Sequence, residues 1–486
     1  MWTLINALGG FWSVLAIVLT VLLSVIASAH AVLYKRDSRA AVGWVGLIWL
    51  VPIIGAALYA MLGINRIRRQ ASEQRAQHPI LSSGQYPSAT VPPRTSVALP
   101  RPVHHLHPLA ELVDRVASRK LTAGNAIAPL LDGDEAYPAM IAAIDAATRS
   151  VALSTYIFDN DYAGGLFVDA LERAVRRGVE VRVLIDTVGS RYSRPSIVRD
   201  LRQRNIRVAL FGRTVVPWRM PYMNLRNHRK ILVVDGRIGF TGGINIREGG
   251  LLQRPSSRPV QDLHFRLEGP VVVHLMQTFG EDWVFTTNEQ LIGRSWFPVL
   301  EQAGEIVARG VNDGPDADFE KARLVLLGAL ACAERSVRIV TPYFLPDAGL
   351  ISALDVASLR GVDVQIVLPA ENNLPSVQWA STAQLWQVLA RGCRVFYTPP
   401  PFDHSKLMLV DDGWALFGST NWDPRSLRLN FEFGVECYDM QLVEQLGRLI
   451  DGKLAGAREV TTREVNSRSL PIKLRDGIAR LAAPYL

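Results

Sequence analysis

The sequence predicts an α/β protein of two similar lobes, preceded by an apolar N-terminal segment. Strand-like and helix-like patterns alternate from about residue 109 onward, which favours mostly parallel sheets flanked by helices. The phrase RRGVEVRVLI in the first half returns as LRGVDVQIVL in the second half. Such an internal repeat predicts two copies of one structural unit, which we place at residues 109–300 and 301–486.

The N-terminal segment has the composition of a membrane anchor. Residues 1–34 contain no Asp, Glu, Lys or Arg, and their apolar centre, 11–29, is long enough to cross a bilayer at about 20 residues per span. A second uncharged run follows at 40–65. A signal peptide is the alternative for the first run, because Ala27–Ala29 resembles a cleavage site. The missing positive charge before that run, and the presence of a second run, favour a two-helix transmembrane hairpin over residues 1–69.

The segments around this hairpin predict on which side of the membrane the lobes lie and how they are connected to the anchor. The loop at 35–39 carries three basic residues and the flank at 66–75 carries four, so the positive-inside rule favours a cytoplasmic location for the lobes by one residue. Residues 70–108 are rich in Gln, Ser, Pro and Arg and show no apolar period. This composition predicts a flexible linker between anchor and lobes.

Each half begins with the same order of elements. In the first half, 151–158 and 179–189 are typical of strands, and the intervening 165–178 is typical of an amphipathic helix. In the second half, strand patterns at 337–344 and 360–369 are again separated by a helical pattern. We therefore expect each half to place its strands in one sheet.

One motif occurs twice and carries the chemistry. The first copy reads NHRKILVVDGRIGFTGGIN and the second reads DHSKLMLVDDGWALFGSTN, with their histidines 176 residues apart. Four further residues stand at the same offsets, +2, +7, +14 and +17, from His228 and His404. They are Lys230, Asp235, Gly242 and Asn245 in the first copy, and Lys406, Asp411, Gly418 and Asn421 in the second. Five matching positions in two copies are not accidental.

The residue types in this motif suit a phosphate ester. An apolar run closed by Asp-Gly predicts a buried strand and a turn, and residues two apart on a strand share a face. The His and Lys of each copy therefore point the same way. The ammonium and the Asn amide can hold phosphate oxygens, while the imidazole can attack phosphorus or move a proton. Asp235 and Asp411 fall near the turn, so we expect them to brace the site rather than contact substrate.

The repeated motif resembles the HxKxxxxD pair of the phospholipase D superfamily, with its G-[GS]-x-N element intact in both halves. The flanking phrases NLRNHRKILVVDG, DLHFRLEGP and STNWDPRSLRLNFEF are similar to those of bacterial cardiolipin synthases. The similarity covers about residues 125–486, and the N-terminal apolar segments fit as well. The resemblance implies two phospholipase D-type lobes and an active site between them.

The resemblance also implies roles for individual residues. One histidine becomes a covalent phosphatidyl-histidine, which assigns attack to His228 and proton transfer to His404. A downstream acid orients each histidine, with Asp262 at +34 and Glu432 at +28 as the candidates. The phosphate-binding and orienting residues implied by the motif are Asn245, Asn421, Gly243 and Ser419, together with Lys230 and Lys406.

The implied function is the transfer of a phosphatidyl group between two phosphatidylglycerol molecules at a bacterial inner membrane. No cofactor or metal is required, and we expect a competent monomer that acts on phosphatidylglycerol and other anionic phospholipids and does not bind nucleic acid. A phospholipase D or another phosphatidyltransferase is the alternative within the superfamily. A nuclease is the alternative outside lipid chemistry, because the net charge of +8 suits DNA.

Other histidines have no second copy and receive a structural interpretation. His264 and His274 are expected in the core, and the group His104, His105 and His107 lies in a Pro-rich stretch. Asp403 beside His404 departs from the family pattern, and either raises the pKa of that imidazole or points away from it.

Overall fold

The computed structural model describes residues 2–35, 38–63, 99, 101–117, 119–212, 226–315 and 319–481. The N-terminal helices form one compact unit, and the described residues from Leu99 to Leu481 form the other. Most of the predicted linker, 70–108, lies outside the described residues, as does the stretch 213–225. The described end of this linker is folded, so the folded part begins earlier than predicted: Arg101–Leu106 (η2) is helical, and Leu99, Val103 and Leu106 are buried in the core of the second lobe.

The N-terminal unit contains one helix with the length and composition of a membrane span among the described residues, at Trp12–Tyr34 within α1 (Trp2–Tyr34). The expected two-helix hairpin is wrong. The second apolar run forms two short helices, α2 (Ser38–Leu50) and α3 (Pro52–Leu58). Pro52 lacks the N–H that a continuous helix needs and disfavours helical angles at the preceding residue; Val51 accordingly has φ −137° and ψ 74°.

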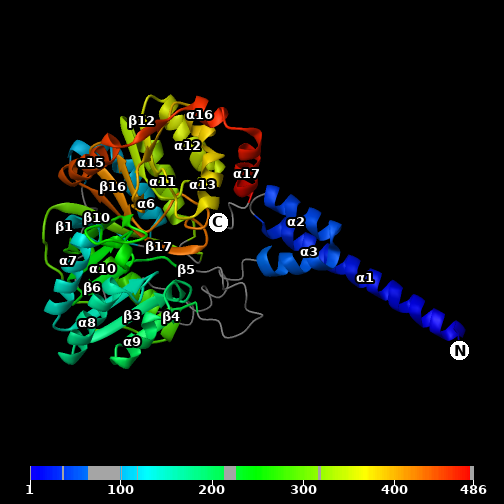
Figure 1. Cartoon of the computed structure of the whole chain (residues 1–486), viewed down its shortest axis with the longest axis horizontal. Helices are drawn as coiled ribbons and strands as arrows, with labels where there is room; N and C mark the ends of the chain where they lie inside the picture. Colours follow the sequence, from blue (N-terminus) through cyan, green and yellow to red (C-terminus); the bar gives the residue numbers. More distant parts are fainter. Residues whose placement is uncertain are drawn as a thin grey trace. The chain divides into compact units, whose positions relative to one another are not determined.

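The two lobes share one continuous sheet (Figure 1). Its strand order is β18-β13-β12-β11-β15-β16-β17-β10-β1-β9-β7-β6-β2-β3-β4. The lobes join where β1 (Thr122–Leu131) pairs antiparallel with β10 (Ile306–Asp313). The other first-lobe strands are β2 (Ser150–Thr155), β3 (Glu180–Asp186), β4 (Val208–Phe211), β6 (Ile231–Val234), β7 (Ile238–Gly242) and β9 (Leu263–Glu268). The other second-lobe strands are β11 (Ser336–Val340), β12 (Asp363–Pro369), β13 (Arg394–Thr398), β15 (Leu407–Val410), β16 (Trp414–Gly418), β17 (Asn430–Tyr438) and β18 (Arg458–Val460).

The repeat is visible in the strand pairing, and it corrects one expectation. In each lobe three strands run parallel, β2-β3-β4 and β11-β12-β13, because helices cross between them. The motif strands β6 and β15 instead form hairpins with β7 and β16 through the turns at Asp235 and Asp411. The main sheet is therefore mixed, and the expectation of mostly parallel sheets is wrong, whereas the α/β class with two similar lobes is confirmed.

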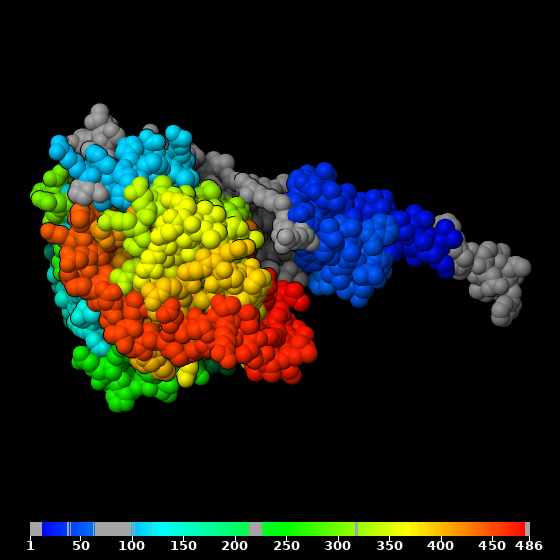
Figure 2. All heavy atoms as spheres, turned by 90° about the horizontal axis from the view of Figure 1, so that it is seen from above, coloured from blue at the N-terminus to red at the C-terminus, as the bar shows by residue number. Residues whose placement is uncertain are grey.

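Helices cover the sheet in both lobes and bury a separate apolar core in each. In the first lobe they are α7 (Asp132–Ala146), α8 (Tyr162–Arg176), α9 (Ile197–Gln203) and α10 (Val272–Thr287). In the second they are α11 (Lys321–Cys332), α12 (Ala348–Leu359), α13 (Pro375–Thr382), α14 (Leu385–Leu389), α15 (Met440–Ala455) and α16 (Thr462–Asn466), joined by α6 (His107–Val116). The C-terminal helix α17 (Leu470–Leu481) packs on α13, and Figure 2 shows this red segment along the edge of the second lobe.

A buried charge beside the lobe junction offers a test of this packing. The Arg309 guanidinium on β10 is fully buried, and its Nε donates to the equally buried Glu436 carboxylate at 2.6 Å. We expect Glu436→Gln to lower the free energy of unfolding by about 3 kcal/mol, because the buried Arg309 cation then keeps only the partly exposed Asp114 as its counter-charge. The control Glu459→Gln breaks a half-exposed pair with Arg394 and should cost less than about 1 kcal/mol. Equal shifts of the two urea midpoints would contradict this packing.

Candidate active site

Each motif histidine is held by the main chain of the other lobe. Arg226–Asn227 (β5) pairs with the start of β17, and the His228 N–H donates to the Phe431 carbonyl at 2.9 Å. Phe402–Asp403 (β14) pairs with Val260–Gln261 (β8), and the His404 N–H donates to the Gln261 carbonyl at 2.8 Å. The two attachments repeat one geometry about the junction of the lobes.

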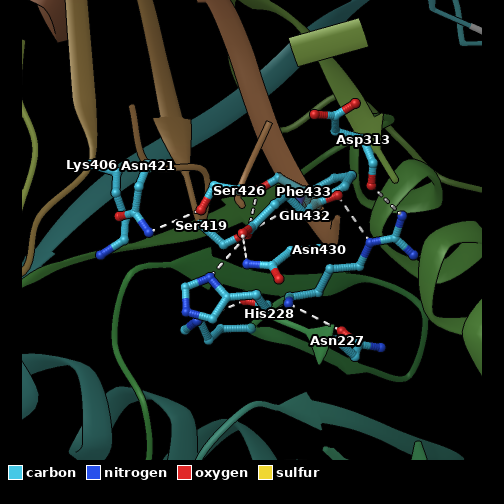
Figure 3. A network of polar contacts seen from close by, with 12 residues as sticks. Asn227, His228, Asp313, Lys406, Ser419, Asn421, Ser426, Asn430, Glu432 and Phe433 are labelled. Carbon is cyan, nitrogen blue, oxygen red and sulfur yellow. Dashed lines mark hydrogen bonds and ion pairs between the residues drawn. The ribbon is translucent and has the colours of Figure 1, made fainter. Parts of the chain in front are cut away.

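This attachment brings each imidazole to an acid of the opposite lobe. His228 Nδ1 lies 3.1 Å from Glu432 Oε2, as Figure 3 shows, and His404 Nδ1 lies 2.7 Å from Asp262 Oδ2. Pairing by offset within each copy would have matched Asp262 with His228 and Glu432 with His404, and that pairing is wrong. The acid follows directly after the residue whose carbonyl binds the histidine N–H, so the strand register enforces the crossing. A carboxylate on Nδ1 fixes the tautomer that leaves Nε2 available for chemistry.

Each motif lysine is hydrogen-bonded to the main chain of the histidine in its own motif. Lys230 Nζ donates to the His228 carbonyl at 2.7 Å, and Lys406 Nζ donates to the His404 carbonyl. Both side chains are almost fully buried, with exposed fractions of 2% for Lys230 and 5% for Lys406. Two buried cations beside two buried acids form a charge-balanced centre that spans the lobes.

The amide and small residues of the motifs complete the floor of the centre. Asn245 and Asn421 both line the cavity; the Asn245 side-chain oxygen accepts from the Ile157 N–H at 3.1 Å, and Asn421 Nδ2 donates to Ser426 Oγ at 3.1 Å. Gly243 packs against Asp262: a Cβ atom at this position would lie 2.1 Å from Asp262 Oδ1. Its counterpart, Ser419, occupies the equivalent space and bonds the Phe433 main chain.

The motif aspartates lie away from the cavity. The Asp235 carboxylate accepts from the N–H groups of Thr148, Arg149 and Ser150 at 2.7–2.9 Å. Asp411 accepts in the same manner from the N–H groups of residues 334–336, and also lies 2.7 Å from His105 Nε2. Each aspartate thus ties the end of its motif strand to the start of the neighbouring strand, as a brace.

A cavity of about 540 Å³ opens between the lobes and contains both imidazoles. Several residues that line this cavity were not predicted from the sequence. The ring of Tyr156 lies 5.1 Å from His228 and that of Tyr343 lies 6.2 Å from His404. Both tyrosines follow the first strand of their repeat, in STYIF and TPYF, and this shared position was the available signal. The cavity is also lined by four arginines, Arg226, Arg247, Arg258 and Arg425.

Burial sets the protonation states of the centre. It lowers the pKa of His228, an effect that the Glu432 charge partly offsets, and it holds the pKa of His404 well below its ordinary value together with the charges of Lys406 and Lys230. Burial also lowers the pKa of Lys230 to about 7 and that of Lys406 to about 8. Both imidazoles are therefore neutral before substrate binds, which is the state a nucleophile or base requires.

The two acids differ. Burial raises the pKa of Asp262 to about 6. Burial pushes the Glu432 pKa in the same direction, but the His228 and Lys230 groups outweigh it and lower the pKa overall. The acid behind His228 is thus the more firmly ionised of the pair.

The remaining histidines and Asp403 take structural positions. His274 Nδ1 accepts from the Gly310 N–H at 3.2 Å, and His264 is buried outside the cavity lining with its pKa lowered to about 4 by burial. The Asp403 carboxylate binds Ser405 and lies 2.7 Å from Lys453 Nζ, so it points away from His404. Among the described residues, no group of three or more His, Cys, Asp or Glu side chains is arranged to hold a metal ion.

Chemically, the centre can bind one phosphodiester between two imidazoles. The lysines and asparagines supply donors for its oxygens, and an imidazole from each lobe is available at phosphorus. The crossed acids stabilise each imidazole when it takes up a proton. This arrangement can support displacement at phosphorus by one imidazole with proton transfer by the other.

Comparisons with known proteins agree with this chemistry. Residues 140–283 and 326–453, together more than half of the chain, match the family described as "Cardiolipin synthase, PLD-like domain", and residues 22–63 match "Phospholipase_D-nuclease N-terminal". The chain is 31% identical to cardiolipin synthase A of Pseudomonas putida strain GB-1, over 96% of both chains. It is 30% identical to the major cardiolipin synthase ClsA of Bacillus subtilis, over 96% of this chain and 98% of that one. The phosphatidylserine synthase of Haemophilus influenzae shares the fold, with a TM-score of 0.62 at 16% identity over 78% of this chain and all of that chain.

Substitution of one acid at a time tests which histidine each acid binds. We expect Asp262→Asn to remove the hydrogen-bonded Nδ1–H resonance of His404 and leave that of His228, and Glu432→Gln to do the reverse. Each change should lower turnover on the order of 10²- to 10⁴-fold, because an amide no longer fixes the imidazole tautomer. Imidazole ¹⁵N NMR of histidine-labelled protein measures this. If Asp262→Asn altered His228 instead, the acids would serve their own lobes.

The lowered pKa values of the two lysines predict that activity declines on the alkaline side of the pH profile. Since kcat/KM reports the free enzyme, it should fall as pH rises through 7 to 8, where Lys230 and Lys406 lose their charges. A bound phosphate raises the lysine pKa values, so kcat should fall only at higher pH. Steady-state rates between pH 6 and pH 9.5 test this. In Lys406→Arg the group stays charged, and its part of this decline should disappear. A flat kcat/KM profile would contradict the assignment.

Proposed function

The chain belongs to the family of cardiolipin synthases with phospholipase D-like domains, and we propose from this membership that it joins two phosphatidylglycerol molecules into cardiolipin and glycerol. The single observation that supports this most strongly is the convergence of His228 and His404, from different lobes, on one cavity, each with its Nδ1 bound to an acid. A centre with two such imidazoles can handle a phosphodiester without an external energy source, since one phosphodiester replaces another.

In the first step an imidazole Nε2 attacks the phosphorus of one phosphatidylglycerol. The N–P bond forms and the bond from phosphorus to the glycerol oxygen breaks. The second imidazole, neutral in the free enzyme, takes up a proton from solvent at Nε2 when the anionic phosphate binds, and it passes this proton to the glycerol oxygen that leaves. Following the family resemblance, we assign attack to His228 and proton transfer to His404. Lys230 and Lys406 offset the charge that builds on the phosphoryl oxygens, aided by the amides of Asn245 and Asn421.

In the second step a hydroxyl of another phosphatidylglycerol gives its proton back to the second imidazole and attacks the same phosphorus. The new O–P bond forms as the N–P bond breaks, which regenerates both histidines. Water competes with this acceptor in the cavity, so transfer requires the accepting lipid to displace water from the phospho-histidine. The same intermediate would make the chain a phospholipase D or another phosphatidyltransferase if water or a different alcohol reached it.

Location follows from the substrate and the N-terminal unit. We propose that α1 anchors the chain in a bacterial inner membrane and that the two lobes, 109–300 and 301–486, act on lipid head groups as a monomer. Lys35, Arg36 and Arg39 follow α1 directly, which favours the cytoplasmic side for the lobes.

Removal of either imidazole tests the shared centre. We expect His228→Ala and His404→Ala each to abolish cardiolipin formation, because neither lobe holds the complete chemistry. The measurement is the conversion of labelled phosphatidylglycerol by purified protein in mixed micelles. Robust cardiolipin formation by either variant would refute the shared centre.

Substrate class can be tested with the same preparation. The unchanged protein should convert phosphatidylglycerol alone into cardiolipin and leave DNA intact, because the chain belongs to a family of cardiolipin synthases and carries an apolar N-terminal helix. Cleavage of DNA without any lipid product would overturn the proposal in favour of a nuclease. Release of phosphatidic acid as the main product would favour a phospholipase D.

A further inference from the structure

The product of the proposed reaction contains two phosphodiesters, and the motif residues account for one of them. Lys230, Lys406 and the two asparagines surround the phosphorus that changes partners. The accepting phosphatidylglycerol brings a second phosphate, six bonds from the first through its glycerol, which is a span of about 7 Å when extended. The same cavity, with its volume of about 540 Å³, must therefore hold a second anion.

Two arginines, one from each lobe, line this cavity close to the junction of the lobes. Arg226 lies on β5 directly opposite Asn430 of β17, and two residues before His228. The Arg425 carbonyl accepts the Asn430 N–H at 3.0 Å. Both side chains therefore start from the same point of the lobe junction, and both line the cavity.

The charges of the two guanidinium groups act on each other. Burial lowers the pKa of Arg425, and the charge of Arg226 is the next cause of that shift. Asp186 and Asp423 are close enough to offset part of this repulsion. Two like charges held near each other at a cavity wall gain more from an anion than either would alone.

The repeat provides an internal comparison, because the other end of the cavity lacks this pair. Two residues before His404 the chain has Phe402, and four residues after Asn245, where Arg425 would have its counterpart, it has Gly249. Phe402 also lines the cavity, opposite Val260. The pseudo-twofold arrangement of catalytic residues is thus broken at the arginines.

The other two cavity arginines belong to the first lobe. Arg247 lies two residues after Asn245, and Arg258 is exposed on the loop before β8.

We propose that Arg226 and Arg425 form a second phosphate site, which binds the phosphodiester of the accepting phosphatidylglycerol while Lys230 and Lys406 hold the phosphorus under attack. The inference rests on the proposed function and assigns its acceptor specificity. A guanidinium pair can engage the non-bridging oxygens of one phosphate from two directions. An acceptor without a phosphate cannot use this site.

The experiment compares two acceptors for the same donor. Cardiolipin formation uses phosphatidylglycerol as acceptor, whereas exchange of labelled glycerol into phosphatidylglycerol uses the same donor and a neutral acceptor. The readout is the ratio of the two rates in one preparation, which does not depend on the fraction of folded protein. We expect Arg226→Gln and Arg425→Gln to lower this ratio about 10- to 100-fold, the loss of a hydrogen bond to a charged group.

Matched variants complete the design. Arg425→Lys keeps the charge but not the planar fork, and should restore part of the ratio. Arg428→Gln, three residues on and paired with Glu320 and Asp347 outside the cavity lining, should leave the ratio unchanged.

The outcomes separate the hypotheses. If both rates fall together in the Gln and Lys variants, the arginines serve the shared donor phosphate and the second site is overturned. An unchanged ratio in Arg226→Gln and Arg425→Gln overturns it as well. Failure of the unchanged protein to catalyse either reaction would instead reject the proposed function itself.

Discussion

Two main-chain hydrogen bonds that cross between the lobes determine the geometry of the candidate active site. The His228 N–H binds the Phe431 carbonyl, and the His404 N–H binds the Gln261 carbonyl. Since the next residue after each carbonyl is an acid, one register places Glu432 behind His228 and Asp262 behind His404. A shift of one residue would turn each acid to the opposite face of its strand and leave each imidazole without its partner.

The same crossing lowers the free-energy cost of burying the charged groups, because it brings opposite charges from the two lobes together. Lys230 and Lys406 would be costly to bury alone, and each lies in the field of both Glu432 and Asp262. Arg229, between the histidine and lysine of the first motif, extends this balance: it is buried, pairs with Asp282 and donates through Nε to the Glu432 carbonyl at 3.0 Å. The charged groups that prepare the centre for phosphate therefore also hold the lobes together.

The local features of this arrangement could be predicted from the sequence, whereas the pairings between residues of different lobes could not. The repeated offsets of His228 and Lys230 were sufficient to place both on one face of a strand, and the recurring strand–helix order was sufficient for two lobes. The pairing of Asp262 with His404 was invisible, because offsets count along one lobe whereas the acid is delivered by strand pairing with the other. The antiparallel hairpins were signalled by Asp-Gly after the first motif strand and Asp-Asp-Gly after the second, but the strand–helix alternation elsewhere suggested parallel neighbours. Pro52 was likewise visible, and it divided the second apolar run into two helices.

The pattern of contacts is that of a two-fold interface enclosed in a single chain. In an isologous interface residue i contacts j and residue j contacts i, and the crossed pairs His228–Glu432 and His404–Asp262 follow this rule. A dimer of identical subunits would have to carry the same residue at both ends of its cavity. A tandem chain has no such constraint, so it can place Arg226 at one end and Phe402 at the other while keeping the imidazoles equivalent in position. In a reaction that joins two molecules of one lipid, this freedom lets the cavity offer the acceptor charged groups that the donor does not contact.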